Sequence, residues 1–250
     1  MKKKLSLVLA TLMLLGLLAG CGGQPAASGD KDTVVVYIGD IFNSMTPYMT
    51  TANSDQAVFD QVYETLTVTK DDGTVAPCLA KSWKMSDDCL EYTFQLEEGV
   101  KFHNGEVMTA DDVVYSFEQY LANPAKNNFV SMIDKVEMVD ANTVKVTLNK
   151  ITPLFLVYIN ELPILNKKFV EEHNGIISDV ACGTGPYKLT SIDLATSAML
   201  ERNDDYRLAP AAIEKVELRY VGDRSTASVQ LETGDLDIMS IDPSQLVSFE

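Results

Sequence analysis

The apolar run from Leu5 to Ala19 constrains this chain most, because it separates a segment for export from the segment that folds. Lys2, Lys3 and Lys4 precede the run. At about 15 residues, it is shorter than the roughly 20 that a helix needs to cross a bilayer. It is therefore typical of a secretory signal peptide. No later segment has 18 consecutive apolar residues, which predicts that the rest of the chain folds in water.

The apolar run ends in Leu18-Ala19-Gly20-Cys21. This tetrapeptide resembles the lipobox of bacterial lipoproteins, in which the cysteine is acylated and becomes the new N-terminus. The resemblance implies a signal peptide over residues 1–20 and a lipid anchor on Cys21, which would hold the protein on the outer face of the cell membrane. The alternative is an ordinary signal peptide with a cysteine near its cleavage site. Residues 21–32 are small, polar and glycine-rich, which predicts a flexible tether.

The net charge limits which macromolecules the protein can bind, and the cysteine count limits its disulfide bonds. The net charge of −16 repels nucleic acid and anionic headgroups, so we expect no nucleic-acid partner. Three cysteines remain besides Cys21, and an odd number argues against a disulfide framework in an exported protein. Cys78 and Cys89 form the one local pair that could be bridged, but free, partly buried thiols fit the pattern better.

The hydrophobic pattern predicts a mixed α/β chain in three stretches. Thr33 to Ile38 is β-branched and apolar, typical of a strand buried on both faces. A mixed insert follows, with a helix that Ser54 could cap, a capping box at Thr109 and Asp112, and two hairpins. The last stretch has a strand–helix–strand order typical of a crossover unit in a mixed sheet; its expected strands are 187–192, 197–201, 216–221 and 236–239.

Catalytic signatures are missing from the sequence. It has no G-x-S-x-G, Walker loop, H-E-x-x-H or C-x-x-C. His103 beside a turn and His173 at a predicted helix end both suit structural roles. The paired aspartates fall at turns and helix starts, where aspartate is favoured locally. We therefore expect no enzymatic activity, no cofactor and no metal site.

Four blocks of residues, in order, resemble the family 5 extracellular solute-binding proteins of ABC importers, the oligopeptide, dipeptide and nickel type. The blocks are Val75-x-Pro77-x-Leu79-Ala80-Lys81-Ser82-Trp83 with Ser86-Asp87-Asp88 and Glu91 to Leu96; Val100 to Gly105 with Thr109 to Ser116; Gly183-Thr184-Gly185-Pro186-Tyr187; and Gly234-Asp235-Leu236-Asp237. Each block alone is weak, but four in this order are specific. The resemblance runs from about Thr33 to the end of the chain.

The resemblance implies a two-lobed clamshell of the type II periplasmic-binding-protein kind. Lobe I would consist of residues 33–48 and 176–250, with 49–175 as its inserted subdomain. The second lobe would be largely missing, so we expect the chain to be a fragment. It also implies a monomer that captures a small solute, with peptide as the default, and delivers it to ABC permease subunits. A surface sensor of the same fold without an importer is the alternative, and the ligand's identity stays open.

In such a clamshell, the loop after the first strand should face the ligand cleft. We therefore predict ligand contacts from Ile41, Phe42, Asn43 and Ser44, with Phe42 and Asn43 the best candidates. Thr184 and Tyr187 are weaker candidates. The alternative is that all these side chains only pack their loops.

Overall fold

The computed structural model describes residues 32–124 and 128–240. The signal segment, the predicted lipidation site Cys21 and all but the last residue of the tether lie outside the described residues. Within them, the strands form two four-stranded sheets and one two-stranded sheet. None of the described helices is long and apolar enough to cross a membrane.

The first sheet joins residues from distant parts of the chain. Its order is β1-β10-β9-β8, and its strands are β1 (Thr33–Ile38), β8 (Tyr187–Asp193), β9 (Ser197–Arg202) and β10 (Lys215–Tyr220). β1 runs parallel to β10, with Thr33 opposite Lys215, and the other pairs are antiparallel. The predicted strands of the last stretch are thereby confirmed up to β10. The division into lobe I and an inserted subdomain stays a prediction.

The crossover unit is present, but its last strand is shorter than predicted. Helix α6 (Arg224–Thr233) follows β10 and ends at Gly234, whose φ of +79° suits glycine. The expected strand 236–239 is a single parallel bridge between Ile238 and Val36. The amides of Asp237 and Ile238 both donate to the Val35 carbonyl, and the Ile238 carbonyl accepts the Tyr37 amide at 2.8 Å, so Ile238 alone pairs with β1.

The burial of β1 also differs from the prediction. Only Val35 is buried, and the other residues of the strand are half-buried. Val35 packs with Ala227 and Leu236 on the α6 side, while Val36 and Ile38 pack against the main core on the other side. Both faces of β1 therefore pack against other residues, but side chains on both faces remain partly exposed to solvent.

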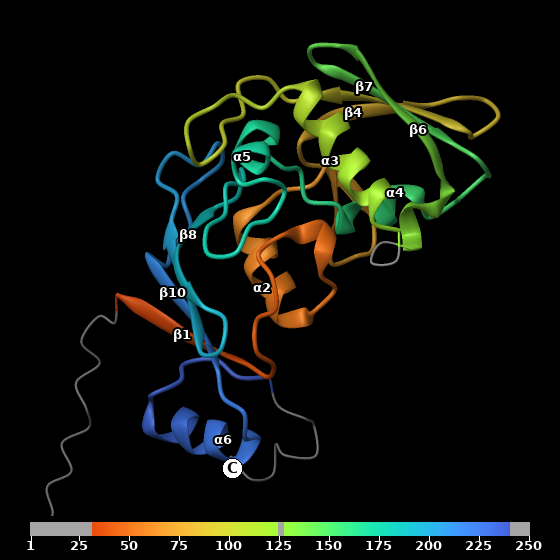
Figure 1. Cartoon of the computed structure of the whole chain (residues 1–250). Helices are drawn as coiled ribbons and strands as arrows, with labels where there is room; N and C mark the ends of the chain where they lie inside the picture. Colours follow the sequence, from red (N-terminus) through yellow and green to blue (C-terminus); the bar gives the residue numbers. More distant parts are fainter. Residues whose placement is uncertain (1–31, 125–127, 241–250) are drawn as a thin grey trace, which may run out of the picture. The chain divides into compact units, whose positions relative to one another are not determined.

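The second sheet lies within the insert and has the antiparallel order β4-β5-β7-β6. Its strands form the two predicted hairpins: β4 (Ala80–Met85) with β5 (Glu91–Leu96), and β6 (Ile133–Asp140) with β7 (Thr143–Leu148). Cys89 lies at the first hairpin tip with φ of +60°. Alternate residues of β5 and β7 are buried, including Phe94 and Val144. Helix α3 (Ala110–Ala122) packs on this sheet (Figure 1).

Shorter elements connect the two sheets. They are the 3-10 helices Pro47–Met49, Asn128–Met132 and Ile159–Glu161, helices α2 (Asn53–Val62), α4 (Phe155–Tyr158) and α5 (Lys167–Glu172), and the pair β2 (Thr67–Thr69) with β3 (Val75–Pro77). The predicted capping box is confirmed, since the Thr109 amide donates to Asp112 Oδ2 at 2.9 Å. Ser54 is not a cap, because α2 begins one residue earlier with Ala52 at its N-cap.

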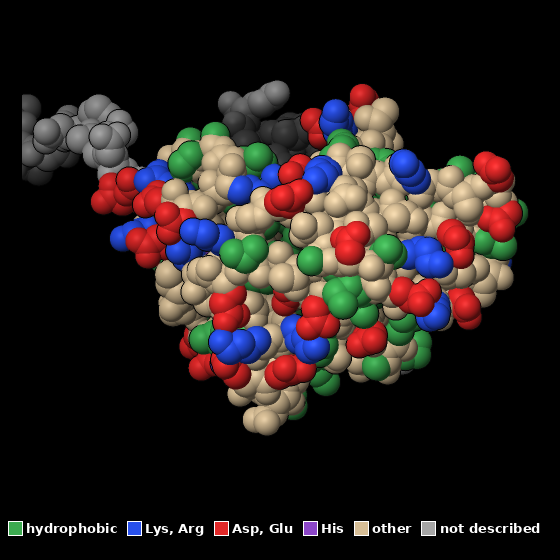
Figure 2. Space-filling model, turned by 90° about the horizontal axis from the view of Figure 1, so that it is seen from above, with side chains coloured by type: hydrophobic (Ala, Val, Ile, Leu, Met, Phe, Trp, Pro, Cys, Tyr) green, Lys and Arg blue, Asp and Glu red, His purple; other side chains and the backbone are tan. Residues whose placement is uncertain are grey.

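The three cysteines of the described residues are all free, with Cys182 buried and Cys78 and Cys89 half-buried. The predicted preference for free thiols is thus confirmed. Despite the acidic composition, Figure 2 shows carboxylates interspersed with lysine and arginine side chains over the face that it presents.

Candidate functional site

The loop after β1 is held by a buried carboxylate. Asp55, on the first turn of α2, is fully buried. Its Oδ1 accepts the Asn43 amide at 2.8 Å, and its Oδ2 accepts the Ser44 amide at 3.2 Å and the Thr50 hydroxyl at 2.6 Å. Hydrogen bonds to an ionised acceptor are stronger than neutral ones and offset the cost of burying it. The loop is therefore fixed rather than free.

Three further hydrogen bonds hold this loop. The Ser54 hydroxyl donates to the Ile41 carbonyl at 2.7 Å, and the Phe42 amide donates to the Leu194 carbonyl at 2.9 Å. The Asn43 side chain also donates to the Ile41 carbonyl, at 3.2 Å. Because neighbouring backbone groups are held from both α2 and the β8–β9 turn, the outward side chains of the loop are presented in one arrangement.

The four predicted loop contacts point in different directions. Ile41 is 48% exposed and Asn43 is exposed, whereas Ser44 is half-buried. Phe42 is only 2% exposed and belongs to the main hydrophobic core. A ligand at the surface of this loop would contact Ile41 and Asn43, while the buried Phe42 side chain packs the loop against the core.

The turn that carries Thr184 and Tyr187 is packed into the protein. Thr184 is 2% exposed, and its hydroxyl has no hydrogen-bond partner among the described residues. Tyr187 is 7% exposed and donates its hydroxyl to the Ile213 carbonyl at 2.9 Å. Neither side chain faces open solvent in this structure.

The glycines of that turn explain its packing. A Cβ atom on Gly183 would lie 2.0 Å from the Val62 carbonyl oxygen, and one on Gly185 would lie 2.6 Å from the Gln61 carbonyl oxygen. The Gly185 amide donates to Val62 O at 2.9 Å. The motif therefore lets the backbone approach the end of α2 closely, which is a use of glycine that requires no ligand.

His103 joins the same turn to the 102–106 turn. Its Nε2 lies 3.0 Å from the Gly185 carbonyl oxygen, and its Nδ1 accepts the Gly183 amide at 3.4 Å. The ring is therefore neutral, with its proton on Nε2. Burial lowers the pKa of His103 below its usual value. His173 is structural too, since its Nδ1 lies 2.7 Å from the Phe169 carbonyl oxygen at the end of α5.

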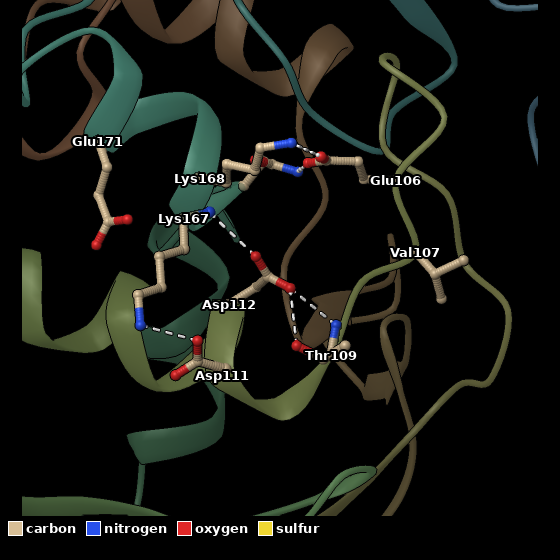
Figure 3. A pocket seen from close by; sticks show the side chains of 9 residues that line it. Glu106, Val107, Thr109, Asp111, Asp112, Lys167, Lys168 and Glu171 are labelled. Atoms are coloured by element: carbon tan, nitrogen blue, oxygen red, sulfur yellow. Dashed lines mark hydrogen bonds and ion pairs between the residues drawn. The ribbon is translucent and has the colours of Figure 1, made fainter.

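A cavity of about 420 Å³ lies between the N-terminus of α3 and α5 (Figure 3). Lys167 pairs with Asp111 at 2.8 Å, and Lys168 pairs with Glu106 at 2.6 Å. Hydrogen bonds from Lys168 and Asn166 lower the pKa of the Glu106 carboxyl. Asp112 is occupied as well, by the Thr109 and Lys167 amides. The two ion pairs and the Asp112 hydrogen bonds connect α3 to α5, and the four carboxylates and two lysines of the lining leave a formal charge of −2. The lining therefore offers no cationic group free of a carboxylate to an anionic ligand.

A second cavity, of about 360 Å³, adjoins a buried ion pair that no pattern in the sequence predicts. The Arg207 guanidinium lies 2.7 Å from Glu64 Oε1, and the Tyr206 hydroxyl donates to the same oxygen at 2.9 Å. Glu64 is 7% exposed. Burial and then the Glu64 charge raise the pKa of the Cys78 thiol to about 11, so it stays protonated and donates to Glu64. The partners are 143 residues apart, so no local signal could reveal the pair.

Residues 74–250 match the sequence model of a family described as bacterial extracellular solute-binding proteins, family 5 Middle. That match covers well over half of the chain. The chain belongs to this family. Family 5 members are binding proteins and not enzymes, in agreement with the missing catalytic signatures. The mixed α/β architecture is that of family 5 periplasmic binding proteins.

Individual family 5 proteins show the same likeness. The probable D,D-dipeptide-binding periplasmic protein of Escherichia coli (strain K12) is 30% identical over 85% of this chain and 44% of its own length. The structure of DppA from Helicobacter pylori with the peptide STSA has a TM-score of 0.77 at 28% identity, covering 86% of this chain and 48% of that one. NikZ from Campylobacter jejuni with Ni(L-His) has a TM-score of 0.79 at 29% identity, covering 88% and 45%. The chain thus spans about half the length of these relatives.

Proposed function

We propose that this chain is part of a solute-binding lipoprotein that captures a small solute outside the cell membrane and delivers it to the permease of an ABC importer. The observation that carries the proposal is the family match over residues 74–250. Peptide is the default ligand class, and the matched structures with a peptide and with a nickel–histidine complex keep both classes in view. The lipid anchor rests on Cys21 and its preceding tripeptide.

Within this proposal, the exposed loop residues Ile41 and Asn43 contact the solute. An apolar side chain beside an amide suits a solute with both apolar and hydrogen-bonding groups. The support is physical, since Asp55 fixes the loop at three donors and removes most of the entropy cost of ordering it on binding. Phe42, Thr184 and Tyr187 take packing roles, because each is less than a tenth exposed.

The loop assignment can be tested with paired variants. The variant Ile41→Ser, Asn43→Ala removes both exposed groups. Its matched control is Ile151→Ser, Asn149→Ala. Ile151 is 62% exposed, and Asn149 is exposed. The side-chain amide of Asn149 donates to a backbone carbonyl, as the side-chain amide of Asn43 does. Each protein is incubated with a library of dipeptides to tetrapeptides and, separately, with a nickel–histidine complex, and retained masses are read by native mass spectrometry.

We expect the control to retain the same masses as the unmodified protein and the loop variant to lose at least tenfold in retention. Equal retention by both variants would contradict the loop assignment while leaving solute binding intact. No retention by the unmodified protein of either class would instead count against peptide and nickel chelate as its ligands.

A further inference from the structure

A third cavity lies where the 101–105 turn meets the end of the first sheet. It measures about 120 Å³ and is lined by Lys101, Phe102, His103, Gly105, Lys188, Asn203 and Asp205. Ligand pockets for organic molecules usually measure about 300–1,000 Å³. This cavity is too small for a peptide but large enough for an ion with a few heavy atoms.

The two lysines of this cavity differ from those in Figure 3. Lys167 and Lys168 are each paired with a carboxylate. Among residues 32–124 and 128–240, no carboxylate oxygen lies within 4.0 Å of the ammonium nitrogen of Lys101 or Lys188, so neither lysine forms an ion pair there. Asp205, on the same cavity, is therefore farther than that from both ammonium groups. Two lysines and one aspartate leave a formal charge of +1 on the lining, since His103 is neutral.

Asn203 supplies a rigid polar wall. It is 4% exposed, its amide nitrogen Nδ2 donates to the Gly185 carbonyl at 3.2 Å, and its Oδ1 accepts the Asp205 amide at 3.3 Å. A primary amide carries two donors, and Gly185 takes one of them. Among the described residues, Gly185 is the one acceptor bonded to Nδ2, so its other proton can be donated to an anion in the cavity that Asn203 lines. The Asn203 backbone is fixed as well, because its amide donates to the Pro186 carbonyl at 2.8 Å.

We propose that this cavity binds a small inorganic oxyanion of the sulfate or phosphate type between Lys101, Lys188 and the Asn203 amide. Lysine binds such anions as a point charge, and the buried amide adds a directed hydrogen bond. The 101–105 turn and β8 come from stretches of chain more than 80 residues apart, so the bound anion ties these stretches together. The site is separate from the loop at Ile41 and Asn43 and does not depend on the transported solute.

Titration of the purified full chain with sodium sulfate, at ionic strength held constant with sodium chloride, tests the site. Amide chemical shifts of Gly105, Lys188 and Asn203 are followed by NMR. We expect saturable shifts at these positions. The variant Lys101→Met, Lys188→Met should weaken binding at least tenfold. Its matched control, Lys84→Met, Lys150→Met, removes two other lysines without an ion-pair partner among the described residues and should bind as the unmodified protein does.

A second variant keeps the test decisive if the double substitution disturbs folding. Asp205→Asn removes the one negative charge of the lining and should tighten sulfate binding by about threefold to fivefold, the effect of one exposed charge pair. Sodium phosphate should reproduce the sulfate shifts, whereas sodium acetate should be weaker. Shifts that rise linearly without saturation, or that are equal in the Lys101/Lys188 variant and its control, would overturn the proposal.

Discussion

The two four-stranded sheets of this chain are stabilised to different degrees. In the β4-β5-β7-β6 sheet, every second residue of β5 and β7 is buried under α3 and α4, and Phe94 packs among Trp83, Tyr92 and Phe155. In the β1-β10-β9-β8 sheet, one face places Leu200 and Leu218 in the same main core, but on the other face α6 buries only Ala227 and meets a small cluster around Val35 and Leu236. Equal strand numbers therefore do not mean equal cores, and we expect local stability to follow burial.

The largest expected effect is in the well-packed sheet. Phe94→Ala removes a fully buried ring and should lower the free energy of unfolding by about 3–5 kcal/mol. The comparison variant is Val229→Ala on α6, whose side chain is 57% exposed and should change the free energy by less than about 0.5 kcal/mol. Urea denaturation of both variants measures the difference. A loss of similar size in Val229→Ala would contradict the sparse packing of α6 on the first sheet.

The ion pair of Glu64 and Arg207 connects the insert to the final stretch and is the next most sensitive point. Arg207→Met leaves the buried Glu64 carboxylate without its cation and should cost about 3 kcal/mol. We expect the low end of the range for buried pairs, because 22% of the Arg207 side chain is exposed. Adding Glu64→Leu to this variant should recover most of the loss in urea denaturation. Independent, additive losses would show that the pair is not coupled.

The glycine turn between the sheets gives an intermediate effect. Gly183→Ala places a methyl group 2.0 Å from the Val62 carbonyl oxygen, and the forced shift should cost about 1–3 kcal/mol. Gly39→Ala is the matched control, since its Cβ would meet nothing closer than the Tyr37 hydroxyl at 3.3 Å. Thermal unfolding of both variants decides the point. An unchanged midpoint for Gly183→Ala would mean that α2 and the turn are not tightly packed.

The smallest effect concerns pH. Burial lowers the pKa of His103 in the folded protein below the value of about 6.5 in the unfolded chain. The folded state therefore favours neutral His103, so its contribution is full above pH 6.5 and declines as the pH falls from there toward the folded-state pKa. His103→Gln should remove this part of the pH dependence between pH 7 and 5 in urea denaturation. An identical slope in both proteins would contradict the assigned burial.

Local chemistry explains what could be predicted from the sequence. The hairpins, the capping box at Thr109 and the end of α6 at Gly234 depend on residues within a few positions of each other. The Asp55 anchor, the Glu64–Arg207 pair and the pairing of β1 with β10 join distant residues, and a single sequence carries no signal for them. Phe42 shows the same limit, since an aromatic loop residue can serve as a contact or as core, and only the fold places it in the core.

The proposed function requires that this family 5 protein be anchored by lipid and carry a small solute. Native mass spectrometry of the protein, extracted from its own membranes in detergent, tests it most directly. We expect a polypeptide that begins at an acylated Cys21 and releases a small mass on activation in the gas phase. An unacylated polypeptide with no releasable mass would contradict both the anchor and the solute-binding role.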